Sequence, residues 1–234
     1  MTDALPAALL AALARYDTPT ICNALELVAP QRRATGFTVH PLMCPFPDLP
    51  PIVGYARTAR IRAQSPSASP AAEQGARRAA YYEYVGRGEG PRISVIEDGD
   101  AHKGFGAFWG EVNSAIHKAL GCLGVVTDGS IRDIPQWADG FQALAGSIGP
   151  SHAHVHVESF GEPITVAGMN VRSGDLVHAD RHGAVVIPHN VAAKLPDAAE
   201  LCGRREEPIL AIARSADFSV EKLKAAMKQS AEIH

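Results

Sequence analysis

The stretch from Gly110 to Asp133 reads GEVNSAIHKALGCLGVVTDGSIRD and predicts a helix, a strand and a polar turn in succession. Residues 111–120 have helical spacing, and Gly121 is well suited to end the helix. The apolar positions that share one stripe of this helix are Val112, Ile116, Ala119 and Leu120. The short apolar run Cys122–Thr127 then predicts a buried strand. Such a unit is typical of an α/β sheet.

The start of the predicted helix can bind a small anion. Gly110 lets the backbone approach a ligand closely, and the amides of the first helical turn have no partner inside the helix. These amides belong to Glu111, Val112 and Asn113. Because the helix dipole adds to their attraction, we expect them to bind a substrate carboxylate.

The turn after the strand contributes charged side chains. Ligands collect at the carboxyl ends of strands in open α/β sheets, and Arg132 and Asp133 offer a cation and a hard oxygen ligand there. We expect Asp128 to order the turn or to orient Arg132 rather than to contact substrate, since Asp-Gly pairs are favoured in turns. Pro135 suits the first turn of a new helix that runs to about Gly140.

The remaining pattern predicts one α/β domain over residues 1–234, with helical segments at 1–35 and 190–234. Five prolines between residues 41 and 51 predict an irregular loop, which we read as a connector rather than a cover over a cleft. A helix is expected at about 70–85, and strands are expected at 52–62, 92–97, 141–145, 164–166, 169–171, 176–178 and 184–187. Alternating strands and helices followed by strands alone predict an α/β/β/α sandwich.

Composition narrows the classes of protein. A hydrophobic content of 46% supports a real core, and a net charge of −3 without a Lys/Arg run argues against nucleic acid as a partner. The apolar start, residues 4–14, is shorter than the roughly 20 residues of a membrane span and lacks a basic leader. Four scattered cysteines indicate neither a zinc site nor a disulfide framework, which favours a reducing cytoplasm.

Three histidines, His152, His154 and His156, alternate with apolar residues and predict a strand with three imidazoles on one face. Such a face could bind a metal ion, or it could be a polar face toward solvent or another subunit. We favour the polar face, because no fourth ligand is indicated.

The chain resembles a known family at several of these residues. They are Trp109-Gly110-Glu111, Asp128 to Asp133, Gly174 to Val177, Asp180, Gly183 and Val185 to Pro188, within a span of about 52–188. An acidic residue, twenty intervening positions and then Arg-Asp form the motif of the class II, divalent-metal pyruvate aldolases related to 4-hydroxy-4-methyl-2-oxoglutarate aldolase. These enzymes share a fold with the regulator of ribonuclease E activity A. Glu111 and Arg132 match that spacing.

The resemblance implies a site and a reaction. It implies an α/β/β/α fold, a homotrimer or homohexamer, and Mg²⁺ or Mn²⁺ held directly by Asp133 and through water by Glu111. Gly110 to Asn113 would bind the carboxylate of a 2-oxo acid, and Arg132 would donate to its keto oxygen as an enolate forms. A water molecule activated by the metal is the leading candidate for the base. Family members also use a glutamate of a neighbouring subunit, for which Glu200, Glu206 and Glu207 are in the right region.

Two other readings compete with the enzyme. Glu111 could be an ordinary first-turn acid, Asp133 a helix cap and Arg132 their ion-pair partner. The protein could also be a binding regulator, because the same fold hosts proteins that inhibit a ribonuclease by contact. Retention of Glu111, Arg132 and Asp133 favours the enzyme. Methyltransferase activity is not indicated, because no G-x-G-x-x-G motif follows a strand.

Overall fold

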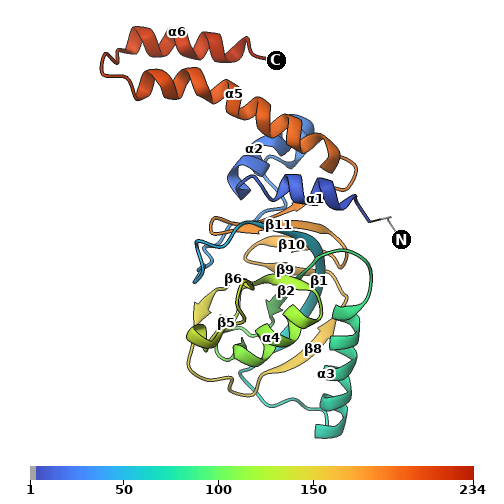
Figure 1. Cartoon of the computed structure of the whole chain (residues 1–234). Helices are drawn as coiled ribbons and strands as arrows, with labels where there is room; N and C mark the ends of the chain where they lie inside the picture. The colour runs from blue at the N-terminus through green and yellow to red at the C-terminus, as the bar shows by residue number, and fades with distance from the viewer. Residues whose placement is uncertain (1–3) are drawn as a thin grey trace.

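A computed structural model describes residues 4–234 and shows a mixed α/β protein built around one curved sheet (Figure 1). The helices are α1 (Ala7–Leu13), α2 (Thr18–Val28), α3 (Ala71–Gly86), α4 (Glu111–Ala119), α5 (Leu195–Ala213) and α6 (Val220–Ala231). Three 3₁₀ turns are η1 (Pro30–Arg32), η2 (Ile134–Gln136) and η3 (Ala192–Lys194). The predicted fold class, an α/β sandwich with helices at its N-terminal and C-terminal ends, is confirmed.

The main sheet is organised by its longest strand, β1 (Ile52–Arg62). The other strands of this sheet are β2 (Arg92–Asp98), β4 (Cys122–Thr127), β6 (Gln142–Leu144), β8 (His156–Phe160), β11 (Leu176–Asp180) and β12 (Gly183–Ile187). The strand order is β12-β11-β1-β2-β4-β6, with β1, β2, β4 and β6 parallel. Two strands share the other edge of β1, because β11 pairs antiparallel with its first half and β8 with its second half.

The chain leaves the main sheet to form a second, smaller parallel sheet. Its order is β3 (Ala107–Trp109), β5 (Ser130–Ile131) and β7 (Ser147–Ile148). Strand β4 ends at Thr127 and β5 begins at Ser130, so Asp128 and Gly129 form the corner between the two sheets. The corner is tight, because a Cβ on Gly146 would lie 2.3 Å from the Asp128 carbonyl oxygen. Only glycine allows this approach of two backbones.

Asp128 orders this corner, in line with one of its two expected roles. Its carboxylate accepts the Asp98 amide at 2.8 Å and the Lys103 ammonium at 2.7 Å. These partners lie in β2 and in the loop after it, so Asp128 joins two parallel strands at their carboxyl ends. No contact between Asp128 and Arg132 occurs within residues 4–234.

The main sheet packs on both faces. One face carries α1, α2 and the first turns of α5 over β11 and β12. The same face carries α3 over the far half of β1, and α4 against β4 and β3. The opposite face packs against the hairpin of β9 (Ile164–Val166) and β10 (Met169–Val171). The side chains of β1 alternate accordingly, with Val53 toward the N-terminal helices and Ala56 toward the hairpin. Successive side chains of β1 point to opposite faces of the sheet, so the alternation determines which layer each of them contacts.

Helix α4 packs by a polar face, which differs from the apolar stripe expected from the sequence. Val112 is 69% exposed, whereas Ser114 and His117 are completely buried. The Ser114 hydroxyl accepts the Ala138 amide at 3.1 Å. His117 is also hydrogen-bonded, so both buried groups are satisfied and their burial is tolerated.

His117 connects α4 to α3. Its Nδ1–H donates to the Asn113 carbonyl at 2.7 Å, and its Nε2 accepts from the Tyr81 hydroxyl at 2.8 Å. The ring lies 4.4 Å from that of Trp109 between centroids. Burial lowers the His117 pKa to about 4, more than the hydrogen bond to Asn113 raises it. The ring is therefore neutral at pH 7 and able to accept from Tyr81.

One local prediction is wrong. The helix expected from Pro135 to Gly140 is only the single turn η2, because Trp137 turns out of helical geometry. The Trp137 side chain is buried instead, and its indole donates to the Phe141 carbonyl at 2.8 Å. The proline-rich segment runs as a connector along β6, where Met43 bridges to Ala145.

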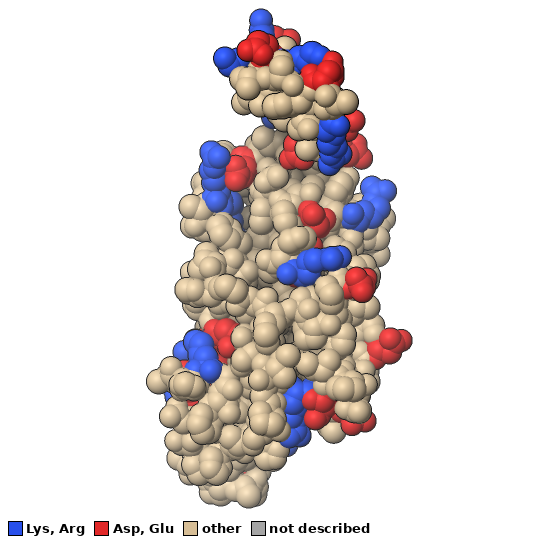
Figure 2. Space-filling model, turned by 90° about the vertical axis from the view of Figure 1, so that its left-hand side faces the viewer, with Lys and Arg blue, Asp and Glu red and all other residues tan. Residues whose placement is uncertain are grey.

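The two ends of the chain form helical layers. Asp17 caps α2 by accepting the Thr20 amide at 2.8 Å. Helices α5 and α6 form a hairpin that projects away from the sheets, and α5 contains Pro208 in its interior (Figure 1). On the face in Figure 2, acidic and basic residues occur together along this arm and are sparser over the body. None of the helices in residues 4–234 has the length and apolar character of a membrane span.

We predict that His117 makes the protein sensitive to mild acid. The His117 side chain takes up a proton near pH 6.5 in the unfolded protein but only near pH 4 in the folded protein. Between these pH values protonation favours the unfolded state. The contribution of neutral His117 to the free energy of unfolding is therefore complete above pH 6.5 and is lost as pH falls toward 4. The loss amounts to about 3 kcal/mol. Urea unfolding of wild type and His117→Gln should therefore give a difference in free energy that shrinks between about pH 7 and pH 4.5.

The comparison uses the difference because burial also lowers the pKa of His178, whose contribution cancels between the two proteins. A difference that is constant over this pH range would show that His117 is not held neutral by the fold.

Candidate functional site

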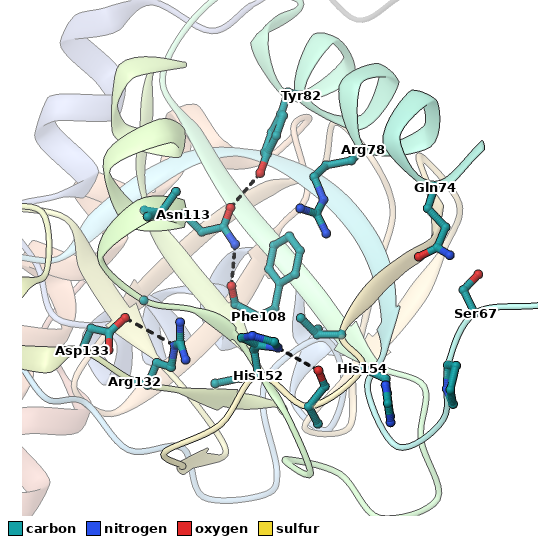
Figure 3. Close-up of a pocket in the computed structure, with 16 residues that line it drawn as sticks. Ser67, Gln74, Arg78, Tyr82, Phe108, Asn113, Arg132, Asp133, His152 and His154 are labelled. Carbon is teal, nitrogen blue, oxygen red and sulfur yellow. Dashed lines mark hydrogen bonds and ion pairs between the residues drawn. The ribbon is translucent and has the colours of Figure 1, made fainter. Parts of the chain in front are cut away.

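A pocket of about 520 Å³ opens beside the small sheet, where β3 and β5 end. Six segments line it: the loop at residues 66–67, one face of α3, residues 107–108 of β3, the first turn of α4, the Arg132-Asp133 turn and residues 152–155 (Figure 3). In parallel sheets the carboxyl ends of neighbouring strands meet at one edge, and loops from that edge commonly build binding sites. The pocket therefore lies where the strand order predicts a site.

The two strand ends are joined directly. The Arg132 amide donates to the Trp109 carbonyl at 2.9 Å, so the residues after β5 lie against Gly110 after β3. A Cβ on Gly110 would lie 2.4 Å from the Asp133 Oδ2 and 3.2 Å from the Arg132 Cγ. The backbone of Gly110 suits any residue, since its φ is −166°, so a side chain at this position would act by displacing the Asp133 carboxylate.

Arg132 and Asp133 form a pair at the pocket wall. The Arg132 Nε lies 3.4 Å from the Asp133 Oδ2, and both side chains are about one third exposed. Asp133 has a φ of 53°, a left-handed conformation that aspartate adopts more readily than most residues. Uncommon conformations of this kind cluster at functional sites, where the surrounding structure holds them.

The first turn of α4 supplies free amides. Gly110 is the N-cap and provides no side chain, so the amides of Glu111, Val112 and Asn113 have no hydrogen-bond partner in residues 4–234. The Asn113 side chain fixes this turn from behind, because it donates to the Phe108 carbonyl at 2.5 Å and accepts from the Tyr82 hydroxyl at 2.8 Å. Free amides at a helix N-terminus favour a bound anion.

The structure brings together most of the side chains and backbone groups predicted for the site. Gly110, Val112, Asn113, Arg132 and Asp133 all line the pocket. Glu111 does not line it; its side chain is exposed and forms no ion pair in the part of the chain that the structure describes. The candidate bases Glu200, Glu206 and Glu207 lie on α5, away from this pocket in the same chain (Figure 1).

The wall formed by α3 was missed by the sequence reasoning. Gln74, Arg78 and Tyr82 are spaced by four residues and therefore share one face of the helix, which faces the pocket in Figure 3. Arg78 forms no ion pair with any residue from 4 to 234. Burial raises the Tyr82 pKa more than Arg78 lowers it, so Tyr82 stays a hydroxyl donor. The spacing of these polar residues at intervals of four in the sequence could have predicted a polar face on α3.

The histidine strand was predicted wrongly. Strand β8 begins only at His156, and Ala153 has a φ of 45° that breaks the alternation. His152 and His154 line the pocket from a turn, whereas His156 is buried and its Nδ1–H donates to the His154 carbonyl at 2.8 Å. The three imidazoles therefore do not share one face.

The donor set at the pocket suits a hard divalent cation only in part. No group of three or more His, Cys, Asp or Glu side chains in residues 4–234 is arranged to hold a metal ion. Mg²⁺ commonly binds through one or two carboxylates and takes its remaining ligands from water and substrate. Asp133, which lines the pocket, and the exposed Glu111 provide that minimum. The residues present therefore fit a cation held largely by substrate and water.

Sequence comparison identifies the class of protein. The model of the RraA-like family, described as Aldolase/RraA, matches residues 18–186. The chain therefore belongs to the RraA-like family. Comparison with curated proteins gives no significant match.

Solved structures agree with this assignment at the level of the fold. An uncharacterized protein from Pseudomonas syringae pv. tomato str. DC3000 is similar over 98% of this chain and 97% of its own, with 19% identity and a TM-score of 0.73. A structure described as novel cellulases from microbes associated with the gut ecosystem covers 89% and 91%, with 18% identity and a TM-score of 0.71. Streptomyces coelicolor RraAS2, an unusual member of the RNase ES inhibitor RraA protein family, covers 88% and 98%, with 24% identity and a TM-score of 0.68.

We predict that Gly110→Ala disturbs the site without disturbing the fold. The new methyl group would displace the Asp133 carboxylate, and the backbone of residue 110 suits alanine. Mn²⁺ binding, measured by the paramagnetic resonance of free Mn²⁺, should weaken about 10–100-fold. The melting temperature should stay close to that of wild type.

Gly75→Ala is the matched control, because a Cβ at this position on α3 meets no atom within 4 Å. Equal Mn²⁺ binding by Gly110→Ala and Gly75→Ala would show that the spacing between Gly110 and Asp133 does not matter to the cation.

Proposed function

We propose that the protein is a metal-dependent carbon–carbon lyase that cleaves a 4-hydroxy-2-oxo acid of the 4-hydroxy-4-methyl-2-oxoglutarate type to pyruvate. The reaction is a retro-aldol cleavage, and the same site decarboxylates oxaloacetate. The observation that carries the proposal is the convergence of Arg132, Asp133 and the free amides of α4 on one pocket. Membership in a family described as Aldolase/RraA supports it.

The substrate carboxylate binds to the amides of Glu111, Val112 and Asn113, where the helix dipole favours an anion. This placement directs the neighbouring keto oxygen toward Arg132, which lines the same pocket. As the C3–C4 bond breaks, negative charge grows on the keto oxygen, and the fixed guanidinium stabilises that charge most strongly in the transition state.

A bound Mg²⁺ or Mn²⁺ ion supplies Lewis-acid polarisation of the 2-oxo group. Asp133 would hold this ion directly, and the exposure of Glu111 outside the pocket lining is compatible with a contact through water rather than a direct bond. The ion pair with Arg132 keeps the Asp133 carboxylate at the pocket wall in readiness for this role.

The α3 wall supports a substrate with a second anionic group. Arg78 projects into the pocket and has no ion-pair partner among residues 4–234 (Figure 3). A carboxylate on the C4 side of the substrate would neutralise it. 4-Hydroxy-4-methyl-2-oxoglutarate carries such a group on C4, whereas the second carboxylate of oxaloacetate is C4 itself and leaves as CO₂.

The proposal includes a cytoplasmic homotrimer or homohexamer. Free cysteines suit a reducing compartment; they are Cys22, Cys44, Cys122 and Cys202. The α5-α6 arm exposes large apolar side chains that a second subunit could cover, namely Leu210, Phe218, Val220 and Met227. Mixed charge on the face in Figure 2 gives no support for a nucleic-acid partner.

A binding regulator of the ribonuclease E inhibitor type is the second candidate. The likeness of the fold to Streptomyces coelicolor RraAS2 favours it. A regulator of this type needs no anion site, whereas the free amides of α4 at this pocket favour a bound anion. The two candidates are therefore separated by assaying catalysis and ribonuclease inhibition with one preparation.

We predict that the purified protein releases pyruvate from 4-hydroxy-4-methyl-2-oxoglutarate and from oxaloacetate when Mg²⁺ or Mn²⁺ is present. Both reactions form the same pyruvate enolate, which Arg132 stabilises. Pyruvate is measured with a coupled dehydrogenase, with chelator-treated protein as the control. Folded protein that is inert toward both substrates but inhibits a ribonuclease would be a regulator.

We predict that Arg132→Lys and Asp133→Asn fail in different ways. Lysine keeps the charge but loses the planar donor fork, so turnover should fall by about 10²–10³ with apparent metal affinity unchanged. Asparagine removes an anionic ligand, so apparent metal affinity should fall and excess Mn²⁺ should restore part of the rate. The measurement is turnover against metal concentration, with circular dichroism to verify folding.

Metal rescue of Arg132→Lys instead of Asp133→Asn would reverse the assigned roles. Near wild-type turnover in both variants would mean that the Arg132-Asp133 pair is only a structural turn.

A further inference from the structure

We propose that His152 is the general base that removes the 4-hydroxyl proton in the retro-aldol reaction, an assignment that rests on the proposed function. His152 lines the same pocket as Arg132 and Asp133. In the view of Figure 3 its ring lies between Arg132 and His154. The side chain is exposed, so a proton that it accepts can pass on to solvent.

The hydrogen bond of the ring fixes which nitrogen is free. The Nδ1 of His152 lies 2.7 Å from the Ala153 carbonyl oxygen, and a carbonyl can only accept. Nδ1 therefore carries the proton in the neutral ring, and Nε2 keeps its lone pair. Histidine with one nitrogen held by a carbonyl is the usual arrangement for an oriented base near neutral pH.

The backbone around His152 is held on both sides. The Ala107 amide donates to the Ser151 carbonyl at 2.9 Å, and the His154 amide donates to the Ala63 carbonyl at 3.0 Å. The His152 carbonyl itself accepts the Val155 amide at 3.0 Å. These bonds attach the turn to β3 and to the end of β1, so the imidazole is presented from rigid elements.

Tight packing forces the turn into an uncommon shape. A Cβ on Gly106 would lie 2.6 Å from the His152 carbonyl oxygen, so the turn presses directly on the backbone before β3. Ala153 has a φ of 45°, which non-glycine residues rarely adopt. Strained backbone next to a pocket is often retained because it aims a side chain. Here it aims the ring that the Ala153 carbonyl holds.

Few other groups at the pocket can accept the proton. Among the lining residues, Asp133 is paired with Arg132, and burial raises the Tyr82 pKa, so Tyr82 stays protonated. His154 also lines the pocket, but its ring has no hydrogen bond within residues 4–234 to fix a tautomer. His152 is thus the lining group whose lone pair is both free and oriented.

The proton and electrons balance in this step. The 4-hydroxyl proton moves to Nε2 of His152, and the electrons of the O–H bond form the new carbonyl at C4. The electrons of the C3–C4 bond pass into the pyruvate enolate, whose oxygen faces Arg132. C3 then takes a proton from the imidazolium or from solvent, which gives pyruvate and restores neutral His152.

Oxaloacetate provides a test, because its decarboxylation forms the same enolate without removing a hydroxyl proton. His152→Ala should lower the turnover of aldol cleavage by about 10²–10⁴, the usual contribution of a general base. Oxaloacetate decarboxylation by the same variant should stay within about threefold of wild type, because solvent can protonate the enolate. Added imidazole should restore part of the aldol activity of His152→Ala, which a purely structural role would not allow.

Two further variants make the experiment decisive. His152→Asn keeps a donor for the Ala153 carbonyl but has no base, so it should lose aldol cleavage as His152→Ala does. His102→Ala, at an exposed histidine outside the pocket lining, should leave both reactions unchanged.

The outcomes separate this assignment from the proposed function. Wild type that releases pyruvate from both substrates while His152→Ala and His152→Asn lose both reactions equally, or neither, would overturn the base and leave the lyase standing. Wild-type protein inert toward both substrates would overturn the lyase and the base together.

Discussion

The hydrogen bond between the Arg132 amide and the Trp109 carbonyl holds two strand ends together, and the pocket depends on it. It brings the side chains after β5 against the backbone after β3, where a Cβ at position 110 would meet the Asp133 carboxylate. The free amides of α4 and the Arg132-Asp133 pair therefore face one volume, although twenty positions lie between Glu111 and Arg132 in the sequence. The parallel pairing of β3 with β5 therefore places residues that are distant in sequence at one pocket.

The helix that starts at this point is held by polar contacts in a closely packed interior. Neutral His117 and Tyr81 join α4 to α3, and Tyr82 reaches the Asn113 side chain one turn earlier. These hydrogen bonds are buried or partly buried, so water competes poorly for them and each fixes an orientation. Helix α3 thereby determines where the free amides of α4 point, while its opposite residues remain exposed.

Strands with regular alternation were predicted well, because burial on two faces leaves a direct trace in the sequence. β1 is the clearest case, since its predicted and observed limits are the same. Buried polar side chains do not produce such a hydrophobic pattern in the sequence. The apolar spacing of α4 therefore predicted that Val112 packs against the core, whereas the buried residue is His117. The turn at His152 was read as a strand because alternating residues do not reveal the positive φ of Ala153. The position of Arg78 at the pocket depends on how distant segments pack, and it can be known only from the folded structure.

The proline inside α5 has a mechanical consequence. Pro208 has no amide hydrogen to donate to the Arg204 carbonyl, so one backbone hydrogen bond is missing in the interior of α5. Bending is concentrated where such bonds are missing. A change in the angle of the outer arm, which carries α6, would therefore be centred on α5 and not on the sheets that build the pocket. The α5-α6 arm could thus adjust its angle to a neighbouring surface without changing the positions of the residues at the pocket.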